Sequence, residues 1–307
     1  MLALKKTVQS NGLTIFRHTE RLMGNNFQIS VVGNDSLLAA KQINIAINEI
    51  SRVEKLLSAF PDDNIINQVN RNAGIKPVKV NPEIFHLISR ALLIAELTCG
   101  VFDITYSSAD KAQYSVDSTT LTCTNYQKII LNATDTTVFL QEEGMRIGFG
   151  ANGKGYAADR AKYVLQMAGV SSGVINVGGD LLTWGLQPDF TAWTVAAADP
   201  EQAAKPYAHI NISDMAIATS VNAEKYAAIN PVVSNTIDPK NGFVVSDIAS
   251  VSIMGPTAEF ADAMATPVMA IGINAGLYLV NQLNQIGCVV IDDQNRVYTS
   301  RDFLITE

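Results

Sequence analysis

The sequence predicts a mixed α/β fold of the α+β kind, built as a single intertwined domain over residues 1–307. Three observations lead to this expectation. Strand-like and helical runs alternate along the chain. Hydrophobic residues make up 48% and charged residues only 17%, enough for a large core and too apolar for a disordered chain. A length of 307 residues also allows two domains, but no stretch has the composition of a linker between them.

The first half begins with two strand-like runs, at 13–17 and 27–32. A long helix should follow, because apolar residues recur at three- and four-residue spacing over 43–60 and line one face.

A second helix is predicted to begin at Asn81 and Pro82, an N-cap residue followed by the proline favoured at the first helical position. It runs toward Gly100. Two short strands are expected after it, near Ile129 and Val138.

The second half opens with a helix whose apolar face spans 157–168 and which should end at Gly169, a typical C-terminal cap. The run 174–177 has the character of a buried strand and leads into a turn at 178–180. The remaining expected elements are strands at 193–197, 208–212 and 250–254, helices from about Ala258 and Asn274, and a closing hairpin around 292–295.

Charge and cysteine content exclude several classes of protein. The 29 acidic and 22 basic residues give a net charge of −7, which argues against a nucleic acid or an anionic membrane surface as the main partner. The three cysteines have no metal-ligand spacing and are odd in number, so neither a zinc site nor a disulfide framework is expected.

The N-terminus carries two lysines and then polar residues, without the apolar segment of a signal peptide. No apolar run approaches the ~18 residues that span a bilayer. We therefore expect a cytoplasmic protein from the sequence as written, and a periplasmic or membrane-anchored one if a leader has been removed.

The glycine-rich segment 148–155 is the strongest local indication of ligand binding. We expect it to follow a short strand and to open a helix, where free backbone N–H groups favour a phosphate. It fits the dinucleotide fingerprint only in part, because no acidic residue lies ~20 positions on. It fits a P-loop only in part, because Gly155 replaces the Ser or Thr that holds magnesium. A phosphate cradle with one lysine, Lys154, and a purely structural tight turn both stay open.

Asp262 and Thr266 lie four residues apart on a predicted helix, which puts a carboxylate and a hydroxyl on one face. Both are hard oxygen donors suited to magnesium. The pair is open to two interpretations: two polar residues on a solvated face, or a buried pair that needs a partner, since apolar residues surround it.

Eight short motifs together resemble the ApbE family of flavin transferases, in the family's order along nearly the whole chain. They are Met23-Gly24, Leu57-Ser58-Ala59-Phe60-Pro61-Asp62, Gly100-Val101-Phe102-Asp103-Ile104-Thr105, the segment ending in Lys154-Gly155-Tyr156-Ala157, Asn176-Val177-Gly178-Gly179-Asp180, Ala218-Thr219-Ser220, Ile237-Asp238-Pro239 and Ala261-Asp262-Ala263-Met264-Ala265-Thr266.

This resemblance implies a T-fold-related α+β architecture and transfer of FMN from FAD to a threonine of an acceptor flavoprotein. It implies Mg²⁺ held by Asp262, Thr266 and the carbonyl of Ala151, with the FAD pyrophosphate beside Lys154. The positions it assigns to FAD binding are Met23, Ser58, Phe60, Asp103, Gly150, Lys154, Asn176, Gly178, Gly179, Asp180 and Ser220.

The sequence departs from the family where a base is expected. Most members carry histidine two residues before Ile-Asp-Pro, whereas this chain has Asn235, and an amide cannot accept a proton at neutral pH. The catalytic set implied is Lys154 and Asn235, with Asp238 as the residue to which the base role could have passed. Gly148 and Val221 also replace the usual residues, and a tryptophan expected after the Phe-Asp-x-Thr motif is absent.

Three functions therefore stay open. The first is a magnesium-dependent FMN transferase, slow because of Asn235. The second is a hydrolase in which water replaces the threonine and FAD yields FMN and AMP. The third is a non-catalytic FAD-binding protein.

Overall fold

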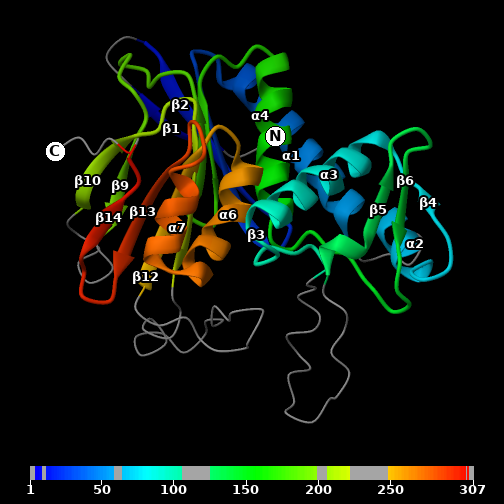
Figure 1. The fold of residues 1–307 in the computed structure, drawn as a ribbon. Helices are drawn as coiled ribbons and strands as arrows, with labels where there is room; N and C mark the ends of the chain where they lie inside the picture. The colour runs from blue at the N-terminus through cyan, green and yellow to red at the C-terminus, as the bar shows by residue number, and fades with distance from the viewer. Residues whose placement is uncertain are drawn as a thin grey trace. The chain divides into compact units, whose positions relative to one another are not determined.

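The computed structural model describes residues 4–8, 12–58, 64–105, 125–198, 206–221, 248–301 and 303 (Figure 1). Contacts divide the chain into two compact units. The first joins Met1–Ser51 with Lys154–Glu307, and the second is Arg52–Gly153. The expectation of one domain over 1–307 stays a prediction.

A nine-stranded sheet forms the frame of the first unit, and every neighbouring pair in it is antiparallel. This confirms the mixed α+β class. In spatial order its strands are β1 (Lys5–Val8), β2 (Thr14–Leu22), β3 (Asn25–Gly33), β7 (Gly173–Val177), β8 (Asp180–Trp184), β11 (Ala216–Val221), β12 (Ile248–Gly255), β13 (Gly287–Asp292) and β14 (Val297–Thr299).

Two-residue turns set the register of two hairpins in this sheet. Met23 and Gly24 join β2 to β3, and both have positive φ, 51° and 74°. Gly178 and Gly179 join β7 to β8 with φ of 64° and 116°. Positive φ at turn residues matches the right-handed twist of the flanking strands, and glycine adopts it at little cost.

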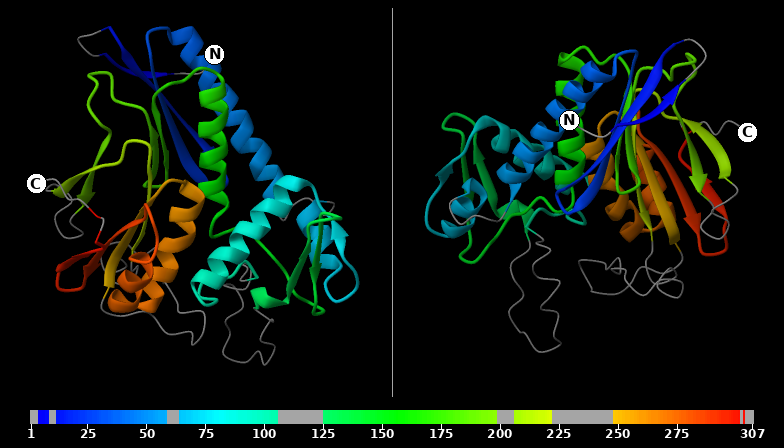
Figure 2. Two further views of the ribbon diagram at one scale, coloured as in Figure 1. Left: turned by 45° about the horizontal axis from the view of Figure 1, so that its top comes forward. Right: turned by 180° about the vertical axis from the view of Figure 1, so that it is seen from behind.

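Both faces of the sheet are covered, which explains why β12 is buried along almost its whole length. Helix α6 (Ala258–Ile271) packs on β11 and β12, and α7 (Ile273–Val280) follows it on the same face (Figure 1). The small sheet of β9 (Thr194–Ala198) and β10 (Pro206–Asn211) lies on the other face (Figure 2), where Trp193 and Ile212 join a core with Ile217 and Met254.

Helix α4 (Gly153–Met167) ends as the sequence predicts. Gly169 has φ of 84°, its N–H donates to the carbonyl of Gln166, and the N–H of Val170 donates to that of Leu165. These two bonds make a Schellman cap, which needs a residue in the left-handed region.

The second unit combines α2 (Ile65–Arg71), α3 (Pro82–Leu97), the 3₁₀ helix η2 (Tyr126–Lys128) and a small antiparallel sheet of β4 (Val78–Lys79), β6 (Thr137–Leu140) and β5 (Ile129–Asn132). Asn81 caps α3 by accepting the N–H of Ile84 at 2.8 Å, as predicted. Helix α1 (Ser36–Leu57) begins in the first unit and ends in the second.

The short strand expected before the glycine-rich segment is β6, but this strand does not lead directly into the segment. The preceding strand, β6, ends at Leu140, and the chain from 141 to 152 forms neither helix nor strand. Instead, the side chain of Asn70 bonds to both backbone groups of Ile147. Its Oδ1 accepts the N–H of Ile147 at 2.8 Å, and its Nδ2 donates to the carbonyl of Ile147 at 3.1 Å. It thereby supplies the hydrogen bonds that a neighbouring strand would give.

Within the part of the chain that the structure describes, no helix is both long enough and apolar enough to cross a membrane.

Candidate functional site

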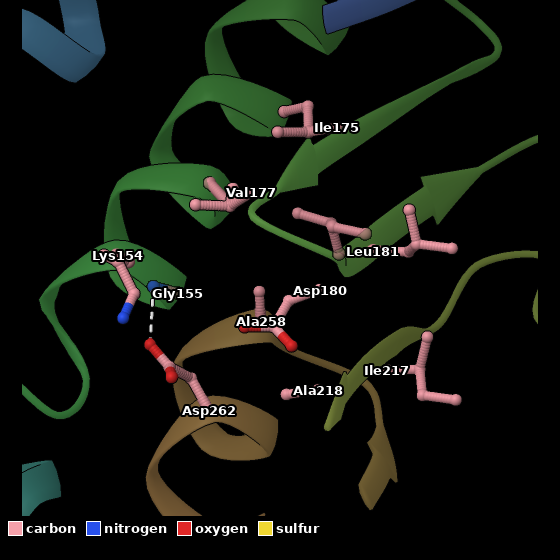
Figure 3. Close-up of a pocket in the computed structure, with 12 residues that line it drawn as sticks. Lys154, Gly155, Ile175, Val177, Asp180, Leu181, Ile217, Ala218, Ala258 and Asp262 are labelled. Atoms are coloured by element: carbon pink, nitrogen blue, oxygen red, sulfur yellow. Dashed lines mark hydrogen bonds between the residues drawn. The ribbon is translucent and has the colours of Figure 1, made fainter. Parts of the chain in front are cut away.

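A small pocket lies in the first unit, where the first turns of α4 and α6 meet the ends of β7, β8 and β11 (Figure 3). Its cavity volume is about 10 Å³, roughly one water-sized sphere. Its charged lining is Lys154, Asp180 and Asp262, set among apolar side chains such as Ile175 and Val177. The pocket therefore suits an ion or one small polar group.

Lys154 and Asp262 approach the pocket from α4 and α6 (Figure 3). The backbone N–H of Gly155 donates to Oδ2 of Asp262 at 3.1 Å. Burial raises the pKa of Asp262 to about 6. The charge of Lys154 opposes that rise, the charge of Asp180 adds to it, and the bond from Gly155 opposes it.

Asp180 is the second carboxylate of the pocket. Its Oδ1 accepts the backbone N–H of Thr219 at 2.9 Å. Burial raises the pKa of Asp180, although the hydrogen bond from Thr219 and the charge of Lys154 each act to lower it. One ammonium thus faces two carboxylates, and a cation bound there would relieve the repulsion that each exerts on the other.

Thr266 lies one turn beyond Asp262 on α6, on the same helix face. Its Oγ1 is 2.9 Å from Oγ of Ser220 on β11. Asp262 is half-buried and Thr266 is exposed, so the pair is neither wholly solvated nor wholly buried. The structure thus brings together Ser220, which was predicted to bind FAD, and Thr266, which was predicted to bind Mg²⁺.

These side chains fit a hard divalent cation by the chemistry of their donors. Asp262 and Thr266 offer oxygen ligands one helical turn apart, and Asp180 adds a second negative charge. Among the described residues, no cluster of three or more His, Cys, Asp or Glu side chains could hold a metal by itself. Ala151, whose carbonyl the resemblance names as a further ligand, lies with Gly150 in the turn before α4, in the second unit. The place of Ala151 stays a prediction.

The turn between β7 and β8 puts only one of its predicted residues into the pocket, Asp180. Asn176 alternates with Ile175 and Val177, which line the pocket, so its side chain lies on the other face of the strand. There its Oδ1 accepts the N–H of Gly179 at 3.0 Å. Asn176 therefore holds the turn that presents Asp180, while FAD contacts by Asn176, Gly178 and Gly179 stay predictions.

The other predicted FAD positions lie on separate elements. Met23 is in the β2–β3 turn and Ser58 directly follows α1. Asp103 accepts the N–H and hydroxyl of Thr105, each at 2.8 Å, and the N–H of Tyr126 at 2.9 Å. Burial raises the pKa of Asp103 in spite of these bonds. Three further predicted residues, Phe60, Asn235 and Asp238, lie outside the described residues.

The structure excludes a P-loop at the start of α4. A Cβ on Gly155 would overlap the carbonyl of Ala258 and lie 2.6 Å from its carbon. A Ser or Thr is therefore excluded at this position, because the first turn of α6 occupies the space of its side chain. The dinucleotide fingerprint fails too, because no strand directly precedes the segment.

Sequence reasoning missed Asp159, whose carboxylate accepts the first two N–H groups of α6, from Ala258 at 2.9 Å and Glu259 at 2.8 Å. The one available indication was its spacing, since Gly155 and Asp159 lie four apart on one face of α4.

A model of the ApbE family matches residues 23–290. The FAD:protein FMN transferase of Treponema pallidum (strain Nichols) is 27% identical over 292 residues, which cover 85% of this chain and 81% of that protein. The FAD:protein FMN transferase of Klebsiella pneumoniae (strain 342) is 25% identical over 300 residues, which cover 93% of this chain and 92% of that protein.

Solved structures share the fold. The ApbE protein of Thermotoga maritima superposes with a TM-score of 0.79 at 21% identity, over 94% of this chain and 97% of that one. The flavin transferase ApbE of Vibrio cholerae superposes with a TM-score of 0.77 at 19% identity, over 98% of this chain and 100% of that one.

Proposed function

The chain belongs to the ApbE family, and from that premise we propose that it transfers FMN from FAD to a threonine hydroxyl of an acceptor protein, with Mg²⁺ as cofactor and AMP as the other product. The observation that carries the proposal is the pocket in which Lys154, Asp180 and Asp262 meet, with Thr266 and Ser220 paired beside Asp262.

The reaction breaks the bond between the two phosphoryl groups of FAD and forms one between the flavin phosphate and the threonine oxygen. Negative charge on the phosphates must be balanced as the AMP leaves. Lys154 supplies one positive charge at the N-terminus of α4, where the helix dipole also favours an anion.

Asp262 and Thr266 would hold the Mg²⁺, which supplies Lewis-acid charge neutralisation when bound. Asp262 is oriented by the Gly155 N–H through Oδ2. Asp180 adds negative charge on the far side of the pocket and is itself held by the Thr219 N–H.

The proton of the threonine hydroxyl has to leave as the new bond forms. Asn235 cannot accept it, so Asp238 is the residue to which we assign this role. General-base assistance is typically worth about 10²–10⁴-fold in rate. Slow transfer is therefore expected, because a carboxylate is intrinsically a weaker base than the histidine usual in the family.

The test is labelling of an acceptor. The chain is incubated with FAD, an acceptor carrying a threonine flavinylation motif, and either Mg²⁺ or EDTA, and the denatured acceptor is inspected for flavin fluorescence and AMP is quantified. A fluorescent acceptor and equimolar AMP, both only with Mg²⁺, support the proposal. An unlabelled acceptor beside tightly bound FAD would reject it.

A second candidate is hydrolysis of FAD to FMN and AMP, and the third, motivated by Asn235, is a non-catalytic FAD-binding protein. In the hydrolysis, water replaces the threonine and the same pyrophosphate bond breaks. AMP that appears at the same rate with and without acceptor would favour this reaction. Binding of FAD with no AMP at all would indicate a flavin-binding protein.

A further inference from the structure

The first turns of α4 and α6 are joined at two levels, one helical turn apart. At one level the Gly155 N–H donates to Asp262 at 3.1 Å. At the other, the Asp159 carboxylate accepts the N–H groups of Ala258 and Glu259 at 2.9 and 2.8 Å. Because the two residues on α4 are four apart, and Ala258 and Asp262 are also four apart, one face of each helix meets the other.

Asp159 supplies most of the N-terminal capping of α6. A helix leaves its first N–H groups without intrahelical partners. Thr257, at the N-cap, reaches only the N–H of Phe260, at 3.4 Å, while Asp159 takes those of Ala258 and Glu259 through separate oxygens. The cap of α6 therefore comes from another helix, and it fixes where α6 begins relative to α4.

Close packing makes this arrangement rigid. The missing side chain of Gly155 lets the Ala258 carbonyl approach α4, and a Cβ there would also lie 2.8 Å from Cα of Glu259. The bonds from Asp159 and the contact at Gly155 thus hold the same turn of α6 from two directions.

The two donors proposed for the cation lie on this helix. Asp262 and Thr266 follow Ala258 by four and eight residues, about 6 and 12 Å along the axis at ~1.5 Å per residue. A shift or rotation of the first turn of α6 would move both donors relative to Lys154 and relative to Ser220, the hydrogen-bond partner of Thr266.

We propose that Asp159 is a positioning residue for the cation site: by capping α6 from α4, it sets the register in which Asp262 and Thr266 meet Lys154. This inference rests on the proposed function, because it takes the Mg²⁺ site as given. Asp159 itself contacts neither the cation nor FAD in this scheme.

The experiment measures Mg²⁺ binding by calorimetry, with FAD-saturated protein, for the wild type, Asp159→Asn and Asp159→Ala. Partners that orient metal ligands typically contribute 10–100-fold in affinity. We expect about tenfold weaker Mg²⁺ binding for Asp159→Ala. A smaller loss is expected for Asp159→Asn, which keeps one of the two acceptor oxygens. FAD affinity in EDTA should change by less than about twofold.

The matched control is Glu49→Gln, which weakens another tether of α4, the 2.9 Å ion pair between Arg160 and Glu49 on α1. Thermal melts of all variants establish that each is folded at the temperature of titration. If Asp159→Ala does not fold, the Mg²⁺ affinity of Asp159→Asn alone is compared with that of the wild type.

Unchanged Mg²⁺ affinity in a folded Asp159 variant overturns the inference, and so does an equal loss in Glu49→Gln, which would indicate general loosening. Wild-type protein that binds FAD but no Mg²⁺ overturns the proposed metal-dependent function and this inference with it.

Discussion

Asp262 is the residue on which the proposed chemistry depends most. It is the only carboxylate proposed as a direct cation ligand, and its charge is balanced by Lys154 across the pocket. Replacing it with asparagine keeps the shape and removes the charge.

We expect Asp262→Asn to lower Mg²⁺-dependent labelling of the acceptor by at least about 10²-fold, since metal charge stabilisation contributes several kcal/mol. The initial rate of flavin transfer over a range of Mg²⁺ concentrations measures this. Asp293→Asn, an exposed carboxylate in the β13–β14 hairpin, serves as the control and should keep wild-type rates. Full activity of Asp262→Asn would show that the cation site is elsewhere.

Asn235 is the residue whose identity sets the expected rate. Restoring the family's histidine should raise transfer by about 10²-fold or more if the base is what limits the reaction. The single-turnover rate of acceptor labelling, compared between the wild type and Asn235→His, measures it. Asn235→Gln, an amide that cannot act as a base, should give no gain, and equal rates in all three would show that another step is limiting.

Asp292, at the end of β13, illustrates a carboxylate with a purely structural role. It accepts the N–H groups of Gln294 and Arg296 at 2.9 and 2.8 Å, the Arg296 guanidinium at 2.6 Å and the Tyr298 hydroxyl at 3.1 Å. Burial alone would raise its pKa, but these bonds, chiefly those from Arg296, lower it to about 2.

A lowered pKa in the folded state contributes stability that is present above the unfolded value near 3.8 and is lost as the pH falls toward 2. We therefore expect Asp292→Asn to be less stable than the wild type at pH 5 and above, with the difference shrinking as the pH falls from 4 toward 2. Urea unfolding of both proteins at pH 6, 5, 4 and 3 tests this. A difference that stays constant over this range would mean that the pKa of Asp292 is the same in the folded and unfolded protein.

At the scale of elements, the contact between α4 and α6 is the most constrained feature. Gly155 carries no positive φ that would require glycine, so its requirement comes from the neighbouring backbone of Ala258 and not from its own conformation. Backbone atoms cannot move aside as the end of a flexible side chain can.

Gly155→Ala should destabilise the protein by about 1–3 kcal/mol, the usual cost of overpacking a close contact. Gly148→Ala is a matched control in the same glycine-rich segment, because a Cβ there meets nothing within 4 Å and its φ is not positive. It should stay within about 0.5 kcal/mol of the wild type. Denaturant midpoints of the three proteins provide the measurement, and equal midpoints for both variants would contradict the assigned contact.

At the scale of the whole molecule, the acidic balance should govern non-specific association. With a net charge of −7, the protein should not be retained on heparin at about 50 mM salt, because like charges repel. Elution from a heparin column beside a basic standard such as lysozyme is the test. Retention would reveal a local basic surface and reopen the question of a nucleic-acid partner.

Much of the fold could be predicted from the sequence. The Asn81–Pro82 helix start, the Gly169 cap and the closing hairpin each depend on neighbours within a few residues, and the structure confirms them. Three strands of the large sheet were missed, namely β1, β8 and β11. Strands β8 and β11 are five and six residues long, and neither shows a clean alternation of buried and exposed residues, because the sheet is covered on both faces where they lie.

Patterns within the sequence were enough to indicate the family, through eight ordered motifs, and to place Asp262 and Thr266 on one helix face, through their four-residue spacing. The folded protein was needed to show that α6 is capped from α4. It also showed that Gly155 donates to Asp262, 107 positions away, and that Ser220 pairs with Thr266, 46 positions away. The physical reason is that helical periodicity is a local property of the chain. Which turn of one helix packs against which turn of another depends on the side-chain volumes and backbone donors of both, and no pattern within either segment specifies that.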